Sequence, residues 1–284
     1  MTTKSDALEI QVNKNTNNPD QAWNVLSRKI KKTSCNHLPL DLPIYPDKVR
    51  FVCISDTHNS IERMKYEIPS GDILLHAGDF TMNGSLKDVE KFSKNLENLQ
   101  SKFSYIVLIA GNHELSFDKN CDRNTVTQDP KIYLKNFLYL EDNLIELFGI
   151  KIYGSPWQPK FGNWAFNLNR GEEILKKWNK IPNECDVLIT HGPPLGFGDI
   201  INGGYHVGCC ELLSTIRERV KPKYHIFGHI HEDPGVWTDE QTTFINASTC
   251  NLRYKPANPP IIFDIPLPEG HEKINTNKNY LFSK

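Results

Sequence analysis

The chain of 284 residues is 38% hydrophobic and 24% charged, which is typical of a folded globular protein with enough apolar side chains for a sizeable core. Its 33 basic and 34 acidic residues give a net charge of −1, which argues against the broad basic surface that binds duplex nucleic acid. No apolar run approaches the roughly 18 residues of a membrane span, and the polar start lacks the apolar stretch of a signal peptide. We therefore expect a soluble cytoplasmic protein that binds neither membranes nor duplex nucleic acid.

The chain contains seven cysteines, which form neither a C-x-x-C pair nor an obvious disulfide framework. Such cysteines fit a reducing compartment, in keeping with the cytoplasmic prediction. The sequence carries no signature of an oligomeric state.

Before the first strong apolar run, the chain is polar and rich in asparagine and lysine. Within this stretch Trp23, Leu26 and Ile30 recur at helical spacing, which predicts a short amphipathic helix. Because the polar motifs described below must meet in space, one catalytic domain is the simplest interpretation of the remainder. We predict an N-terminal arm with a short helix over residues 1–48 and a single catalytic domain over residues 49–284.

From residue 49 onward, apolar runs alternate with segments of helical pattern, which indicates an α/β fold. The runs that predict buried strands are 49–55, 73–75, 105–110, 187–190 and 225–227. The helix candidates are 86–99, 130–137, 171–179 and 209–220. Further strands are predicted at 144–148, 151–153, 242–246 and 261–264. These extra strands favour mixed sheets over a purely parallel one.

Each of the five buried strands is followed by a short segment with carboxylate, imidazole or carboxamide side chains. The segments are Asp56-Thr57-His58, Gly78-Asp79, Gly111-Asn112-His113-Glu114, His191-Gly192 and Gly228-His229-Ile230-His231. One such segment is common by chance, but the ordered set is not. Ligands at strand ends converge on one rim of a sheet, so we expect them to meet. The candidate metal ligands, sufficient for two ions sharing one carboxylate, are Asp56, His58, Asp79, Asn112, His191, His229 and His231.

This donor set contains no thiolate, which suits a catalytic Mn²⁺, Fe²⁺ or Zn²⁺ better than a structural zinc cage. We expect two divalent ions, Mn²⁺ in the first place, with Fe²⁺ or Zn²⁺ as alternatives. Their charge outweighs that of Asp56, Asp79 and a bridging hydroxide, so the centre attracts an anionic substrate. A metal-bridging hydroxide can attack phosphorus in line, which makes phosphoester hydrolysis the natural reaction. His113, next to Asn112, is the candidate catalytic residue because it can protonate the leaving oxygen or stabilise developing charge.

These motifs resemble the calcineurin-like metallophosphoesterases, whose pattern D-x-H, G-D, G-N-H-D/E, H and G-H-x-H is met at every position. The resemblance spans Phe51 to about Asp264. Longer strings, such as Tyr153-Gly-Ser-Pro-Trp and Asn246-Ala-Ser-Thr-Cys, are similar to the metallophosphoesterase domain-containing subgroup of animals. Glu114 stands where many relatives have aspartate, a variation that leaves the ligand set untouched.

The resemblance implies a four-layer α/β/β/α sandwich of two mixed sheets flanked by helices. It also implies that one ion takes Asp56, His58, Asp79 and His231, and that the other takes Asp79, Asn112, His191 and His229. Asp79 would then bridge the two ions. In part of the subgroup a histidine of the G-H-x-H segment is replaced by glycine, which weakens metal binding. Both histidines are present here, so the resemblance implies a competent enzyme.

Relatives of this kind hydrolyse phosphodiesters, including cyclic nucleotides, and the resemblance implies a small phosphodiester or nucleotide as substrate. The candidate substrate-binding residues are Asn112, His113, Trp157 and His206. An aromatic-rich loop, which either stacks a base or simply packs on itself, contains Trp157, Phe161, Trp164 and Phe166. His206 lies in a glycine-rich loop that either overhangs the site or has no contact with substrate.

The leading hypothesis is thus a dinuclear metal-dependent phosphodiesterase. A phosphomonoesterase or protein phosphatase is an alternative, disfavoured because only Arg170 and Arg253 offer an additional grip on phosphate. A nucleotide-binding scaffold protein with slow turnover is a third hypothesis. The complete ligand set and the presence of His113 argue against it.

Overall fold

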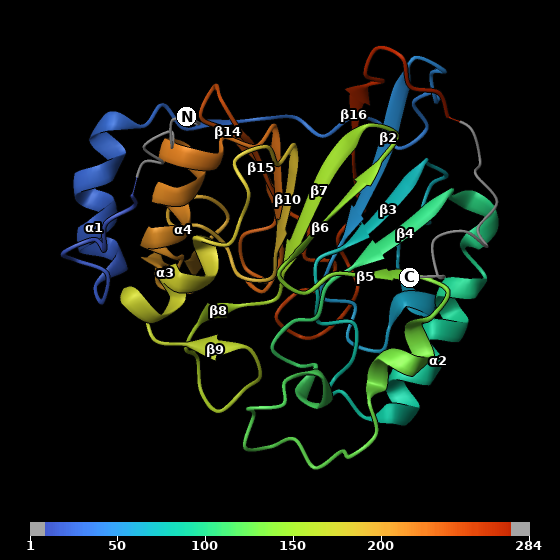
Figure 1. Ribbon diagram of the computed structural model, residues 1–284, viewed down its shortest axis with the longest axis horizontal. Coiled ribbons are helices and arrows are strands. Elements are labelled where there is room, and N and C mark those ends of the chain that lie inside the picture. Colours follow the sequence, from blue (N-terminus) through green and yellow to red (C-terminus); the bar gives the residue numbers. More distant parts are fainter. Residues whose placement is uncertain (1–8, 274–284) are drawn as a thin grey trace, which may run out of the picture.

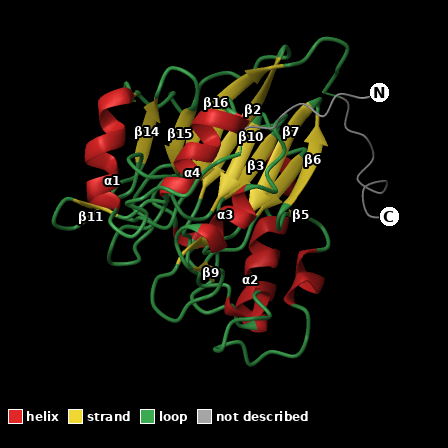
Figure 2. Cartoon of the chain, turned by 60° about the vertical axis from the view of Figure 1, so that its left-hand side comes forward, coloured by secondary structure: helices red, strands yellow, loops and turns green. Residues whose placement is uncertain are grey.

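Two mixed β-sheets lie face to face at the centre of the computed structural model, which describes residues 9–273 (Figure 1). The helices are α1 (Pro19–Leu26), α2 (Leu86–Glu97), α3 (Glu172–Trp178) and α4 (Cys210–Ser214). Helices α1, α3 and α4 lie beyond one sheet and α2 beyond the other, and Figure 2 shows the same arrangement of outer helices and inner strands. The fold is therefore the expected mixed α/β sandwich in four layers. Within residues 9–273, no helix has the length and apolar character to cross a membrane.

The first sheet has the strand order β16-β2-β3-β4-β5. Its strands are β2 (Lys48–Ile54), β3 (Ile73–His76), β4 (Tyr105–Leu108), β5 (Leu138–Tyr139) and β16 (Ile261–Pro266). Strands β2 to β5 run parallel, and β16 pairs antiparallel with β2. The carboxyl ends of β2, β3 and β4 consequently lie at the same edge of the sheet.

The second sheet has the order β1-β14-β15-β13-β10-β7-β6. Its strands are β1 (Thr33–Ser34), β6 (Asn143–Leu147), β7 (Ile150–Ser155), β10 (Val187–Thr190), β13 (Tyr224–Phe227), β14 (Gly235–Thr238) and β15 (Thr243–Asn246). Strands β7, β10, β13 and β15 are parallel, while β1, β6 and β14 pair antiparallel with their neighbours. Two short ribbons join β8 (Gln158–Pro159) to β9 (Asn167–Leu168) and β11 (Ile200–Ile201) to β12 (Tyr205–His206).

Alternation of side chains along each strand builds two hydrophobic cores. In β2, Phe51 and Cys53 point into the core between the sheets, whereas Val52 and Ile54 belong to the core that also contains the helices. Strand β10 does the same on the other sheet, where Val187 and Ile189 face the first sheet. Strands in both sheets are buried on both faces. Their sequences are therefore continuous apolar runs, which is why these strands could be predicted.

Two predicted helices differ from the structure. Residues 130–137 form only a 3₁₀ turn, Pro130–Leu134, because the Tyr133 carbonyl accepts a hydrogen bond from Ser93 Oγ (2.6 Å) and Phe137 N bonds back to Leu134. The predicted helix 209–220 begins as α4 and continues as a π-helix, Thr215–Val220. Further 3₁₀ turns are Ser27–Lys29, Ile61–Arg63, Gln100–Lys102 and Leu115–Phe117.

The described part of the predicted arm is packed on the remainder of the chain, and its boundary at residue 48 stays a prediction. Strand β1 extends the second sheet by pairing with β14. The buried carboxylate of Glu211 accepts hydrogen bonds from Thr16 Oγ1 (3.0 Å) and Asn13 N (3.3 Å). Trp23 on α1 packs edge to face on Phe197, with ring centroids 6.1 Å apart. Residues 1–8 of the arm, and residues 274–284 at the other end, lie outside the described residues.

The Trp23 ring lies close to the backbone of Gly196. Its φ is +88°, and a Cβ placed there would lie 2.1 Å from the Trp23 ring. We expect Gly196→Ala to lower the free energy of unfolding by about 2–4 kcal/mol, measured by urea denaturation, since strain and a clash add. Gly204→Ala is the matched control, because Gly204 also has a positive φ (+82°) but nothing within 4 Å. Equal losses in the two variants would contradict the role of Trp23.

Candidate metal centre

The five polar segments found in the sequence meet at one edge of the sandwich. They directly follow the carboxyl ends of β2, β3, β4, β10 and β13, which all point to that edge. Among residues 9–273, three groups of side chains have ligand atoms within 4.8 Å of one another. One of them, His58, Asp79 and His113, overlaps both of the others, which are Asp56, His58 and His231, and Asp79, His191 and His229. Asp79 Oδ2 lies between them, 3.9 Å from His58 Nε2 and 3.4 Å from His191 Nε2. Asn112 completes the second group, with Oδ1 2.9 Å from His191 Nε2.

Backbone carbonyls fix the orientation of the imidazoles. Three rings place Nδ1 against a carbonyl oxygen: His58 against Thr81 (3.2 Å), His113 against Met82 (2.6 Å) and His191 against Ala77 (2.9 Å). A carbonyl oxygen only accepts, so Nδ1 carries the hydrogen in each ring. The Nε2 lone pair of each neutral ring is then left to face the centre, which is the arrangement typical of metal-binding histidines.

Hydrogen-bond acceptors that point into the candidate metal centre lie close together, and a cation there would bind them. His191 Nε2 and Asn112 Oδ1, 2.9 Å apart, are both acceptors when the ring is neutral and the amide oxygen points inward. His58 Nε2 and His231 Nε2 lie 3.2 Å apart. The carboxylates of Asp56 and Asp79 are buried, and within residues 9–273 neither forms an ion pair with lysine or arginine. The donor set therefore fits divalent metal ions, which satisfy all these groups at once.

The electrostatic surroundings of His191 also indicate a site for a metal ion. Burial lowers the pKa of this imidazole, but the carboxylate of Asp79, with help from Asp56 and the Ala77 carbonyl, outweighs burial and raises the pKa to about 9. The surroundings of His191 thus favour a positive charge, which a bound metal ion supplies in place of the proton.

Backbone strain is concentrated at the same residues. Four of the seven candidate ligands are non-glycine residues with positive φ: Asp56 (+53°), His58 (+39°), Asp79 (+54°) and His229 (+69°). Each such conformation costs on the order of 1–3 kcal/mol and persists only where the surroundings impose it. Strain of this kind is typical of functional sites, and it is independent of the sequence motif.

Two motif glycines let the segments approach each other. A Cβ at Gly111 would lie 2.3 Å from Asp79 Oδ1, and a Cβ at Gly228 would lie 2.0 Å from Asp56 Oδ2. These distances are far below van der Waals contact. The glycines of the G-N-H and G-H-x-H segments are therefore required by close packing against the two carboxylates.

Glu114 connects the segment after β3 to the segment after β4 through hydrogen bonds. Its Oε2 accepts hydrogen bonds from Asp79 N (2.8 Å) and Gly111 N (2.7 Å), and its Oε1 accepts from Thr81 N (2.9 Å). The side chain is fully buried. Glu114 thus positions Asp79 without facing the centre itself.

The isosteric change Glu114→Gln tests this role, because it turns one of the two acceptor oxygens into a donor that faces backbone N–H groups. We expect the free energy of unfolding of the metal-free protein to fall by about 2–3 kcal/mol in urea denaturation, the cost of leaving buried donors unpaired. Glu146→Gln, on an exposed position of β6, is the control. Unchanged stability in the Glu114 variant would show that the carboxylate is not needed as an acceptor.

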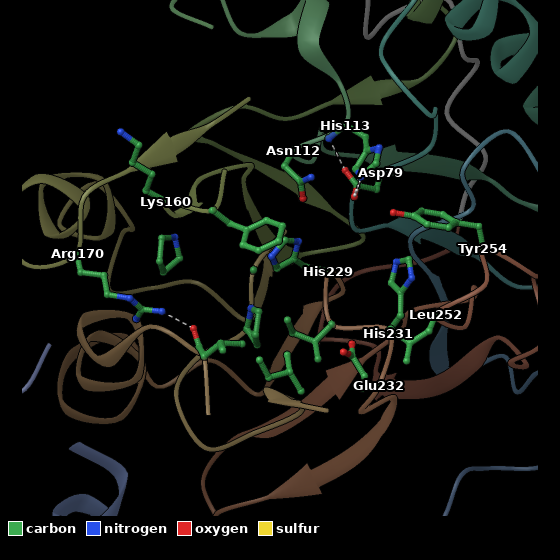
Figure 3. A pocket seen from close by; sticks show the side chains of 17 residues that line it. Asp79, Asn112, His113, Lys160, Arg170, His229, His231, Glu232, Leu252 and Tyr254 are labelled. Carbon is green, nitrogen blue, oxygen red and sulfur yellow. Dashed lines mark hydrogen bonds and ion pairs between the residues drawn. The ribbon is translucent and has the colours of Figure 1, made fainter. Parts of the chain in front are cut away.

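His113 and Asn112 line a cavity of about 380 Å³. Figure 3 shows Asp79, Asn112, His113, His229 and His231 around one part of it, with Lys160 and Arg170 on the far side. The His113 ring is stacked on Trp164, with centroids 4.2 Å apart, and its Nε2 lies 3.9 Å from Asp79 Oδ2. The cavity therefore opens directly onto the candidate metal centre.

The sequence left open whether the aromatic-rich loop faces a substrate or packs on the protein, and the structure shows both within the same loop. Phe161 is 61% exposed and lines the cavity. Trp157 is only 9% exposed, donates a hydrogen bond from Nε1 to Asp142 Oδ2 (3.0 Å), and does not belong to the described wall of this cavity. His206 is also absent from the described wall of this cavity. Its Nδ1 lies 2.8 Å from Asp199 Oδ1, and its ring packs on Trp23.

Sequence reasoning missed several residues of this site. Tyr254 and Leu252, from the loop after β15, line the cavity and are 44% and 50% exposed. Lys160 also lines it, next to Phe161. Ser248 donates a hydrogen bond to Asp56 Oδ2 (2.9 Å). Only Ser248 had a signal in the sequence, as part of the string that begins at Asn246.

Comparison with known proteins shows the family to which the chain belongs. Residues 49–233 match the model of the calcineurin-like phosphoesterase family. The chain belongs to this family, and the family and the clustered aspartate and histidine side chains define it as a metal-dependent phosphoester hydrolase.

Individual relatives are similar over most of the chain. The human protein called metallophosphoesterase domain-containing protein 1 is 44% identical over 93% of this chain and 87% of its own length. UPF0046 protein T07D4.2 of Caenorhabditis elegans is 46% identical over 91% of this chain and 70% of its own length. Among solved structures, a purple acid phosphatase from yellow lupin matches with a TM-score of 0.38 and 15% identity, over 66% of this chain and 39% of that one.

Proposed function

We propose that the protein is a dinuclear metal-dependent phosphodiesterase that hydrolyses small phosphodiesters, cyclic nucleotides among them. The observation that carries this proposal is the position of Asp79. Its buried carboxylate lies between two groups of inward-facing imidazoles and lines a cavity large enough for a nucleotide.

In this proposal each ion is held by four side chains and Asp79 is shared. Asp56, His58, Asp79 and His231 would hold one ion, and Asp79, Asn112, His191 and His229 the other. Oxygen and imidazole donors without a thiolate suit Mn²⁺, with Fe²⁺ or Zn²⁺ as alternatives. When bound, two such ions polarise the phosphoryl oxygens and lower the pKa of a water molecule, so that it attacks phosphorus at neutral pH.

The residues of the chain complete the reaction. The attacking water would release one proton to the solvent as its oxygen forms a new bond to phosphorus, the bond from phosphorus to one ester oxygen breaks, and that oxygen leaves with the electron pair. His113, held by Met82 and Trp164, directs Nε2 toward the cavity and supplies the proton that the leaving oxygen takes up. Because Nδ1 already carries a hydrogen, the ring donates from Nε2 as a cation, with Nε2 3.9 Å from Asp79 Oδ2.

The cavity wall favours a diester over a monoester. A monoester carries more negative charge, yet Arg170 already donates to the carbonyls of Val207 (2.5 Å) and Gly208 (2.7 Å), and the positive charge of Lys160 in the wall is offset by the acidic side chain of Glu232. Phe161, Leu252 and Tyr254 expose apolar surface to the cavity, which fits the second ester group of a diester or the base of a nucleotide. A small-molecule substrate is therefore proposed.

A substrate panel tests the proposal. Purified protein is stripped of metal with a chelator and reloaded with Mn²⁺, Fe²⁺ or Zn²⁺ in parallel. Turnover of bis-p-nitrophenyl phosphate, p-nitrophenyl phosphate, and 2′,3′- and 3′,5′-cyclic nucleotides is then compared. We expect diesters to react with a higher kcat/KM than the monoester, and only after reloading. A preference for the monoester would favour the phosphatase alternative, and metal binding without turnover of any substrate would favour the scaffold alternative.

A further inference from the structure

Tyr254 lies against the imidazoles of the candidate metal centre. Its ring centroid is 4.8 Å from that of His58, 5.5 Å from that of His231 and 6.2 Å from that of His113, in edge-to-face arrangements. The side chain lines the cavity, and Figure 3 shows its hydroxyl directed toward Asp79. Asn112 and His113 reach Asp79 from a different side. Tyr254 thus contributes a further wall to the space next to the shared carboxylate.

A tight loop holds Tyr254 in this position. Cys250 and Pro256 form an isolated antiparallel bridge that closes the loop. Within it, Asn251 N donates to Lys255 O (2.9 Å) and Tyr254 N donates to Asn251 O (2.8 Å).

The backbone of Tyr254 is strained. Its φ is +53°, a left-handed conformation that is uncommon for a bulky residue and costs on the order of 1–3 kcal/mol. Glycine or asparagine would adopt this conformation at lower cost. Asp56, His58, Asp79 and His229 at the candidate metal centre share this left-handed conformation.

The phenol group is available to a ligand. Among residues 9–273 the Tyr254 hydroxyl has no hydrogen-bond partner, although the ring packs closely on three polar side chains. A phenol O–H donates a strong hydrogen bond to an oxyanion. The non-bridging oxygens of a phosphoryl group next to Asp79 are such acceptors.

We propose that Tyr254 is a further catalytic residue, whose hydroxyl donates a hydrogen bond to a phosphoryl oxygen and stabilises the charge that develops there during hydrolysis. The inference rests on the proposed phosphodiesterase function and adds a residue that no motif contains. A donor aimed at developing charge is strengthened in the transition state more than in the ground state, so its effect falls on kcat rather than on KM.

Two substitutions separate the hydroxyl from the ring. Tyr254→Phe keeps the packing on the imidazoles and removes only the donor, and we expect kcat on bis-p-nitrophenyl phosphate to fall about 10- to 100-fold with KM and manganese content unchanged. Tyr254→Leu also removes the ring. Tyr45→Phe, on an exposed tyrosine that precedes β2, is the matched control and should keep full activity. If Tyr254→Phe were fully active and only Tyr254→Leu impaired, the ring would be a packing element and the inference would fail.

Orthovanadate binding gives a second readout that needs no turnover. Calorimetry on the manganese-loaded protein should show about tenfold weaker vanadate binding in Tyr254→Phe than in wild type, with equal melting temperatures. If wild type hydrolyses diesters but the Phe variant matches it in kcat and vanadate affinity, the Tyr254 inference is wrong and the proposed function stands. If wild type hydrolyses no diester, the proposed function fails, and vanadate affinity alone then decides whether Tyr254 grips a phosphoryl-like anion.

Discussion

Replacing Asp79 with alanine is expected to abolish diester hydrolysis, with a loss in kcat of at least about 10³-fold, and to remove both metal ions. Asp79 supplies the buried carboxylate that lies between the two ligand groups, 3.4 Å from His191 Nε2 and 3.9 Å from His58 Nε2. Its other oxygen accepts a hydrogen bond from His113 N (2.8 Å), so it also fixes the segment that carries the proposed proton donor. Two metal ions supply several kcal/mol of transition-state stabilisation, and 1.36 kcal/mol corresponds to a factor of ten.

Elemental analysis of the purified variant, together with kcat on bis-p-nitrophenyl phosphate, checks this expectation. Asp79→Asn is a useful companion, because it keeps the shape and the acceptor for His113 N but loses the charge, and it should bind metal only weakly. Asp41→Ala, on an exposed loop, is the control for removal of an aspartate. Metal content and turnover at wild-type level in Asp79→Ala would refute the shared-carboxylate arrangement.

The strands and the meeting point of the seven candidate ligands were predictable from sequence for a physical reason. Both faces of each sheet are buried, so strands such as 187–190 are continuous apolar runs that are easily recognised. Parallel strands then bring their carboxyl ends to one edge, which places Asp56 and Asp79 together whatever the length of the connections. The ordered polar segments were informative because the fold leaves them no other place to lie.

The parts that escaped prediction depend on contacts between residues distant in sequence. Whether an aromatic residue of the loop is buried cannot be read locally: Trp157 is held by Asp142 and by Lys177, whose Nζ lies 3.7 Å from its ring, while Phe161 stays exposed. Tyr254 lies in a loop with no apolar period and no motif, and its left-handed backbone follows from the bridge between residues on either side. The 3₁₀ turn at 130–134 likewise reflects the hydrogen bond from Ser93.

Replacing His113 with alanine is expected to lower kcat by about 10²–10⁴-fold while both metal ions stay bound, which is the usual range for loss of a general acid. The metal ions should remain because His113 is not needed by either proposed ligand set, and because its backbone N–H, which alanine retains, still donates to Asp79 Oδ1. The ring is rigid in the native protein, held by the Met82 carbonyl at 2.6 Å and stacked on Trp164. The loss should therefore fall on the chemical step.

The leaving group makes this expectation specific. A p-nitrophenolate leaves without being protonated, whereas the alkoxide of a nucleoside needs a proton, so His113→Ala should lose far more activity on a cyclic nucleotide than on bis-p-nitrophenyl phosphate. His37→Ala, on an exposed histidine, is the control. Equal losses on both substrates would assign His113 to stabilising charge on the phosphoryl group instead of protonating the leaving oxygen. Full activity of His113→Ala on both substrates would exclude a catalytic role for His113.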